Sequence, residues 1–234
     1  MAVPTQSGRR GSDRSGLTLL EAVDLATTDL LTYELRRLLA FPVPLALWGD
    51  GALARAAKVG NPDAVQLYML FVGRDPKLPE GDQQRLLWGR TRFDEGMSLL
   101  HQAAGGFGSA GSLRCEQHYA VGVYMRTLLA LPLLESFKLD VIGELHRSEG
   151  HGPQTSARVA MQHGRLGVAT EMMCAVLDAR STPQERAARL DALDVAPDEL
   201  LAQLASRNVT GMSMRLQASL RVLRRPANAL PKLR

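Results

Sequence analysis

The sequence is short of the residues that build β-sheets. Its 234 residues include a single isoleucine, Ile142, with 15 valines and 11 aromatic residues, against 39 leucines. Leucine favours helices, whereas β-branched and aromatic side chains are enriched in strands. This imbalance disfavours a sheet, and we predict an all-α protein.

The chain also lacks long apolar runs and has few cysteines. The best apolar run, 128–134, is far shorter than the roughly 20 residues of a membrane helix and contains a proline. No apolar stretch follows the two arginines near the N-terminus, so we predict neither a membrane span nor a Sec-type signal peptide. Two cysteines, Cys115 and Cys174, cannot build a framework of several disulfides, which fits a reducing compartment. We therefore expect a cytoplasmic location in the producing cell.

Positive charge is concentrated at the two ends of the chain. From Arg207 onward there are seven basic residues and no acidic one, and residues 1–16 carry three arginines against Asp13. The whole chain has a net charge of +4, yet residues 17–206 carry −5. An acidic body opposes the approach of a polyanion, so we do not expect nucleic acid as the partner. Nucleic-acid binding by the basic C-terminal helix stays open as an alternative function.

Apolar residues at helical spacing, interrupted by Gly and Pro, divide the chain into four parts. Residues 1–16, rich in Ser, Gly and Arg, are predicted to be a disordered arm, and 17–44 a helical N-terminal cap. Residues 45–180 contain a recurring pattern, and 181–234 form a helical extension with a basic tail. That extension starts at a capping-box sequence, Thr-Pro-Gln-Glu at 182–185.

The recurring pattern is a turn, a short helix that ends in small residues, a glycine turn and a longer helix. It occurs at 51–65, 94–104 and 157–173. The clearest copy, DEGMSLLHQAA at 94–104, resembles the D-G-x-T-P-L-H-x-A-A opening of the ankyrin repeat. Ser98 stands at the Thr position and His101 at the His position. The resemblance implies that hydroxyl and imidazole hydrogen-bond the turn, that alanine pairs let helices approach closely and that glycine ends the first helix.

The spacing of the three copies departs from that of ankyrin repeats. Their alanine positions 56, 103 and 160 lie 47 and 57 residues apart, against about 33 in the family. We assign the extra length to an insertion at 76–90 and a helix-rich stretch at 113–150. The predicted fold is thus an ankyrin-like helical-repeat solenoid of about three degenerate repeats with helical caps. An irregular helical domain is the alternative.

Ankyrin-like stacks bind other proteins and carry no chemistry of their own. The resemblance therefore implies a protein–protein interaction module, not an enzyme, with no cofactor and no metal. We expect the exposed turn residues Arg90, Asp94 and Glu95 to contact the partner. Ankyrin-like repeats beside a Ser-, Gly- and Arg-rich arm also resemble bacterial type III secreted effectors. In these virulence proteins the arm serves as an export signal and the repeats bind a host protein.

A cysteine-dependent enzyme is the second alternative function. Cys115 and His118 lie three residues apart on a predicted helix, where a thiol and an imidazole can meet. A cysteine nucleophile needs such a base and a third group that orients it. No third group is evident, so we interpret the pair as an exposed cysteine near a surface histidine.

Two further segments have polar or glycine-rich patterns. Glu144, His146, Glu149 and His151 lie in a predicted loop beside Gly150 and Gly152 and are interpreted as a solvated polar turn. The zinc-ligand types Cys174, His146, His151 and His163 are too scattered to predict a zinc site. The glycine-rich segment 105–111 lacks the Gly-Lys-Ser/Thr ending of a phosphate-binding loop and follows a helix, not a strand. We predict a flexible insertion in a turn there.

Overall fold

The computed structural model describes residues 19–24, 28–40, 51–90, 97–108, 113–146 and 152–224. Within these ranges the chain is predominantly helical, so the prediction of an all-α protein is confirmed apart from one pair of two-residue strands. The arm predicted at 1–16 lies outside the described residues. The elements are, in chain order, α1 (Leu19–Asp24), α2 (Thr28–Ala40), α3 (Ala52–Val59), α4 (Pro62–Val72), α5 (Glu80–Trp88), α6 (Leu99–Ala104), α7 (Cys115–Ala130), α8 (Glu135–Ile142), β1 (Leu145–His146), β2 (Gln154–Thr155), α9 (Ser156–Gln162), α10 (Leu166–Asp178), α11 (Pro183–Leu193), α12 (Pro197–Ser206) and α13 (Thr210–Arg224).

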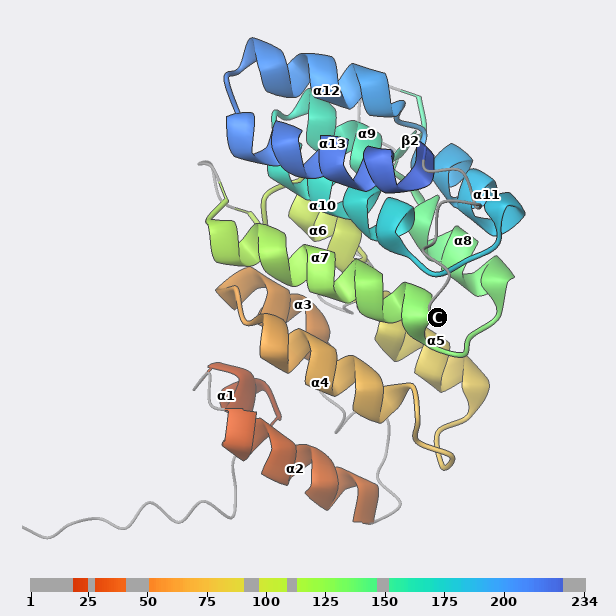
Figure 1. Ribbon diagram of the computed structural model, residues 1–234. Coiled ribbons are helices and arrows are strands. Elements are labelled where there is room, and N and C mark those ends of the chain that lie inside the picture. The colour runs from red at the N-terminus through yellow and green to blue at the C-terminus, as the bar shows by residue number, and fades with distance from the viewer. Residues whose placement is uncertain are drawn as a thin grey trace, which may run out of the picture.

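The chain forms pairs of a shorter and a longer helix, and each pair packs on the next one along the chain (Figure 1). The longer helices α2, α4, α7, α10 and α13 each contact the next one in this order. The short helices do the same, since α1 contacts α3, α3 contacts α6 and α6 contacts α9. The helices of the predicted C-terminal extension follow the same arrangement, because α12 and α13 pack together and both contact α10.

A third helix follows each of the pairs α3–α4, α6–α7 and α9–α10. These third helices, α5, α8 and α11, lie along one edge of the stack, on the right in Figure 1. Trp88 of α5 packs edge-on against Phe137 of α8, with 5.7 Å between the ring centres. Arg189 of α11 donates hydrogen bonds of 2.6 and 2.7 Å to the two carboxylate oxygens of Glu135 in α8. The extra length at 76–90 and 113–150 is thus partly a third helix placed equivalently in each unit.

The turn from a short to a long helix has the same backbone geometry in four places. Gly60, Gly106, Gly164 and Asn208 have φ angles of 77°, 84°, 68° and 55°. At each turn, the amide of the following residue donates to the carbonyl five residues earlier. This left-handed helix ending favours glycine, which has no Cβ. At Gly60 the space is also closed, since a Cβ would come within 2.9 Å of Cβ of Glu116 in α7.

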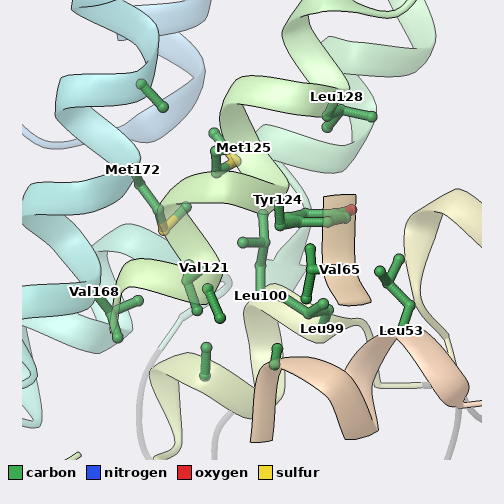
Figure 2. Close-up of a cluster of buried hydrophobic side chains, with 14 of the residues drawn as sticks. Leu53, Val65, Leu99, Leu100, Val121, Tyr124, Met125, Leu128, Val168 and Met172 are labelled. Atoms are coloured by element: carbon green, nitrogen blue, oxygen red, sulfur yellow. The ribbon is translucent and has the colours of Figure 1, made fainter. Parts of the chain in front are cut away.

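The core lies between the stacked helices and unites α4, α6, α7 and α10 (Figure 2). Alanines 56, 57, 103, 104 and 160 are at most 1% exposed, so small residues do occupy the helix contacts as predicted. Tyr124 of α7 is fully buried, and its hydroxyl donates a hydrogen bond of 2.8 Å to the carbonyl of Leu87 at the end of α5. Burial raises the pKa of this phenol, so it remains a neutral donor.

Candidate interaction site

Glu144 lies at the centre of a polar cluster at the edge formed by the third helices. It follows α8, and its carboxylate bonds to residues from the end of α5 and the start of α6. The indole Nε1–H of Trp88 donates a hydrogen bond of 2.8 Å to Oε2, and Arg90 donates one of 2.7 Å to Oε1. Nδ1 of His101 lies 3.1 Å from Oε2. One carboxylate therefore connects the ends of three helices.

The first turn of α6 holds the imidazole of His101 in place. Ser98 is the N-cap of α6, and its Oγ accepts the backbone N–H of His101 at 3.2 Å. The same Oγ lies 2.8 Å from Nδ1 of His101. The Ser98 hydroxyl therefore bonds to the turn backbone, as the resemblance implied, and it also contacts the imidazole. Both residues are buried, so the ring has a fixed orientation toward Glu144.

Hydrogen bonds outweigh burial in setting the charge of Glu144. Its side chain is only 12% exposed, and burial by itself raises the pKa of a carboxyl group. Hydrogen bonds with His101, Ser98 and Trp88, together with the charge of His101, lower the pKa of Glu144 to about 2. Glu144 is therefore ionised at neutral pH and orients the donors around it.

Ser98, His101 and Glu144 are the residue types of a catalytic triad, but their geometry differs from one. In a triad the imidazole accepts the proton of the nucleophile at one ring nitrogen and donates to the acid from the other. Here Ser98 and Glu144 both face Nδ1. Ser98 is also fully buried and caps a helix with its hydroxyl. The three side chains therefore join α6 to the end of α8 and cannot relay a proton in series.

His146 extends the cluster to the next unit of the stack. It lies in β1, which pairs antiparallel with β2, opposite Gln154. Its ring contacts the ring of His101, and its Nε2 lies 3.0 Å from Oγ of Ser156, the first residue of α9. Side-chain contacts thus run without interruption from the end of α5 to the start of α9.

Exposed apolar residues are next in the chain to residues of this cluster, and one of its members carries a stacked arginine. The guanidinium of Arg90 stacks over the ring of Trp88, 4.0 Å from its centre. Met97, which precedes Ser98, is 43% exposed, and Leu145, which follows Glu144, is 58% exposed. Tryptophan and arginine are the residue types that contribute most energy to protein interfaces, and methionine is also enriched there. We call Trp88, Arg90, Met97 and Leu145 together the Arg90 surface.

One of the three residues predicted to bind a partner can be placed. Arg90 is exposed and belongs to this surface, whereas Asp94 and Glu95 lie outside the described residues. The prediction that Glu144 and His146 belong to a solvated turn is wrong. Both side chains are partly buried and hydrogen-bonded, because α8 ends against α5 and α6 and the chain continues into β1. Trp88 and Leu145 were not predicted, since no local motif marks them.

The structure describes only parts of the polar segment 144–151 and of the glycine-rich segment 105–111. Glu149 and His151, and residues 109–111 of the glycine-rich segment, lie outside the described ranges. Within that segment, Phe107 is 5% exposed and belongs to the core. The segment therefore includes a core anchor, which the prediction of a flexible insertion did not include.

Cys115 and His118 are not hydrogen-bonded to each other. Cys115 is the first residue of α7 and is exposed. The ring of His118 lies against Gly167 of α10, and its Nδ1 has no hydrogen-bond partner in the described part of the chain. Cys174 is buried in α10. The described structure thus holds no imidazole against the exposed thiol.

The basic C-terminal helix is attached to the acidic body. Arg215 of α13 forms an ion pair with Glu171 of α10, and Arg126 of α7 lies 3.3 Å from the same carboxylate. Leu216 is fully buried, so α13 packs on the body through its apolar side, while Arg221 is exposed. At least one arginine of α13 is therefore paired within the protein.

Neither a metal centre nor a membrane span was found in the described ranges. They contain no group of three or more His, Cys, Asp or Glu residues that could hold a metal ion. None of their helices is long and apolar enough to cross a membrane.

Comparison with known proteins does not identify a family. No family model matches the sequence, and no match was found among curated proteins or solved structures. The residues and their arrangement are therefore the basis on which function is inferred.

Proposed function

We propose that the protein is a protein–protein interaction module that binds its partner through the Arg90 surface. The observation that carries this proposal is an exposed arginine stacked on Trp88, together with the exposure of Met97 and Leu145, which are next in the chain to Ser98 and Glu144 of the same cluster. The polar groups next to these side chains are fixed by the ionised carboxylate of Glu144. A surface ordered before binding loses less conformational entropy on association. These features suit contact with another protein.

The architecture that we infer is a solenoid of helical repeats with ankyrin-like helix pairs. Two features support it: the order of short, long and third helix occurs three times, and four turns share one left-handed geometry. In a solenoid each unit contacts its neighbours, and equivalent edges line up into an extended binding surface. The Arg90 surface lies on the edge formed by α5 and α8. The third helix distinguishes these units from the two-helix pattern of the ankyrin family.

The binding proposal is tested by affinity purification with mass spectrometry, comparing three forms of the chain. The test variant combines Arg90→Ala, Met97→Ala and Leu145→Ala. A control variant combines Tyr33→Ala and Met214→Ala, which remove two side chains on α2 and α13 that are 60% and 65% exposed. We expect a protein that copurifies with the wild type and with the control but not with the test variant. Equal recovery by all three forms contradicts binding through the Arg90 surface.

We also propose that the protein is a bacterial effector delivered to a host cell by type III secretion. Support comes from the composition of residues 1–16, which resemble an export arm in their content of Ser, Gly and Arg. The test fuses the chain to an adenylate cyclase that is active only inside host cells. We expect cyclic AMP in the host only when the secretion apparatus and residues 1–16 are both present. Equal delivery of a fusion that begins at residue 17 contradicts the export role.

A further inference from the structure

A cavity of about 540 Å³ lies at the turns between short and long helices, apart from the Arg90 surface. The start of α7 forms one wall through Leu113 and His118. The α9–α10 turn, from His163 to Gly167, forms a second wall. The α12–α13 turn closes it with Arg207 and the residues that follow. Its volume is within the range of about 300 to 1,000 Å³ that is usual for small-molecule sites.

The polar side chains that line this cavity are basic. They are His118, His163, Arg165 and Arg207, and none of the described residues that line the cavity is acidic. Arg207 and His163 form no ion pair within the described part of the chain, and both are exposed. Burial, and to a smaller extent the charge of Arg165, lower the pKa of His118, so the positive charge of the cavity comes mainly from the two arginines. The cavity therefore attracts anions.

Three glycines allow these basic groups to approach the backbone closely. A Cβ at Gly164 would collide with the guanidinium of Arg207, and one at Gly167 would collide with the imidazole of His118. The side chains of Arg207 and His118 are thus packed against the α9–α10 turn and the amino end of α10, whereas the guanidinium of Arg165 lies against Gly106 in the α6–α7 turn. At the amino end of α10 the first amides of the helix have no acceptor within the helix and add positive potential.

The rest of the cavity wall is apolar and includes Leu113, Leu166, Val209 and Met212. We infer that the cavity binds a small phosphate monoester. The phosphate group lies between Arg207 and the amino end of α10, and the organic group lies against Leu113 and Met212. The guanidinium of Arg207 and the first amides of α10 offer several donors to the three oxygens of a phosphate monoester, whereas a carboxylate presents only two. The apolar wall favours an organic phosphate over inorganic phosphate.

The test is calorimetric titration of the full chain at low ionic strength with phenyl phosphate, inorganic phosphate and benzoate. We expect phenyl phosphate to bind about tenfold more tightly than either of the other two. The substitution Arg207→Gln is expected to weaken phenyl phosphate binding about tenfold, because it removes a charge-assisted donor. The control Arg180→Gln, an exposed arginine outside the cavity, is expected to leave binding unchanged.

A second variant and a second measurement distinguish weaker binding at the cavity from weaker binding caused by unfolding. Met212→Ala is expected to weaken phenyl phosphate binding while leaving inorganic phosphate binding unchanged. Imidazole NMR signals of His118 and His163 are expected to shift when phenyl phosphate is added. The absence of binding at millimolar phenyl phosphate, equal binding of benzoate, or unchanged affinity in Arg207→Gln would each overturn the inference.

Discussion

The edge made of turns and the edge made of third helices are built in different ways. The four short-to-long turns at Gly60, Gly106, Gly164 and Asn208 are each closed by backbone hydrogen bonds within a few residues and end in a left-handed residue. On the other edge, side chains bond across 54 to 56 positions of the chain, from Trp88 and Arg90 to Glu144 and from Arg189 to Glu135. The turns repeat from unit to unit, whereas each junction of third helices differs. The comparison indicates that the turns maintain the stack and that the junctions give it an individual surface.

We call the edge made of turns the turn edge and the edge made of third helices the junction edge. The largest effect is expected at the junction edge, from Glu144→Ala. This change leaves Trp88, Arg90 and His101 without their shared acceptor in a mostly buried place. Removing one member of a buried charged network costs about 3 kcal/mol in the free energy of unfolding. Denaturant unfolding measures this loss. Glu144→Gln, which keeps a carbonyl acceptor, is the control and is expected to lose less. A loss below about 1 kcal/mol for Glu144→Ala would show that the cluster does not hold the edge together.

The same carboxylate is expected to make the protein sensitive to acid. The pKa of Glu144 is about 2 in the folded protein, below its ordinary value of 4.5. Because the folded value is the lower one, the stabilisation is complete above about pH 4.5 and is lost as the pH falls toward 2. It amounts to about 3 kcal/mol at most. Denaturant unfolding between pH 7 and pH 3 should show a difference in the free energy of unfolding between the wild type and Glu144→Gln, and this difference should shrink as the pH falls. A difference that does not change with pH would contradict the assignment of the stabilisation to the ionised Glu144.

At the turn edge, Gly60→Ala is expected to destabilise the fold by about 2 kcal/mol. The new alanine has to adopt a φ of 77°, and its Cβ lies against Glu116 of α7. Gly81→Ala is the matched control, because Gly81 lies in α5, where a Cβ meets nothing within 4 Å. Thermal unfolding should show a large loss for the first variant and no loss for the second. Equal melting temperatures would mean that the turn tolerates a side chain.

The smallest effect is expected from Asn208→Gly at the last turn. Asn208 has a φ of 55°, the geometry that glycine adopts at the three earlier turns. Glycine relieves the left-handed strain there, so the free energy of unfolding should rise by about 0.5 kcal/mol. A decrease, measured by denaturant unfolding, would show that this turn is not equivalent to the others.

The turn edge was largely predictable from the sequence because its signals are local. The glycine turns of the copies at 51–65 and 157–173 occur at Gly60 and Gly164. The capping box of Thr182 and Glu185 is a local signal on the other edge, and it marks the start of α11, where both expected hydrogen bonds occur at 2.8 and 3.2 Å. The last turn escaped notice because Asn208 replaces glycine.

The junction edge could not be predicted for the opposite reason. Glu144 looked like a loop residue, since nothing in its neighbourhood shows that Trp88 and His101 donate to it. Only the packing of α5, α6 and α8 brings these groups together. Arg90 was predicted from its place on an exposed turn. The apolar part of its surface, Met97 and Leu145, depends on the same packing and left no sequence pattern.

The most direct test of binding through the junction edge is site-specific photo-crosslinking in cells. A photoreactive phenylalanine analogue replaces Leu145 in one form of the protein and Met214, an equally exposed residue on α13, in another. We expect one defined protein adduct from position 145, abolished by Arg90→Ala in the same chain, and none of that adduct from position 214. The same adduct from both positions, or none from position 145, would contradict binding through the Arg90 surface.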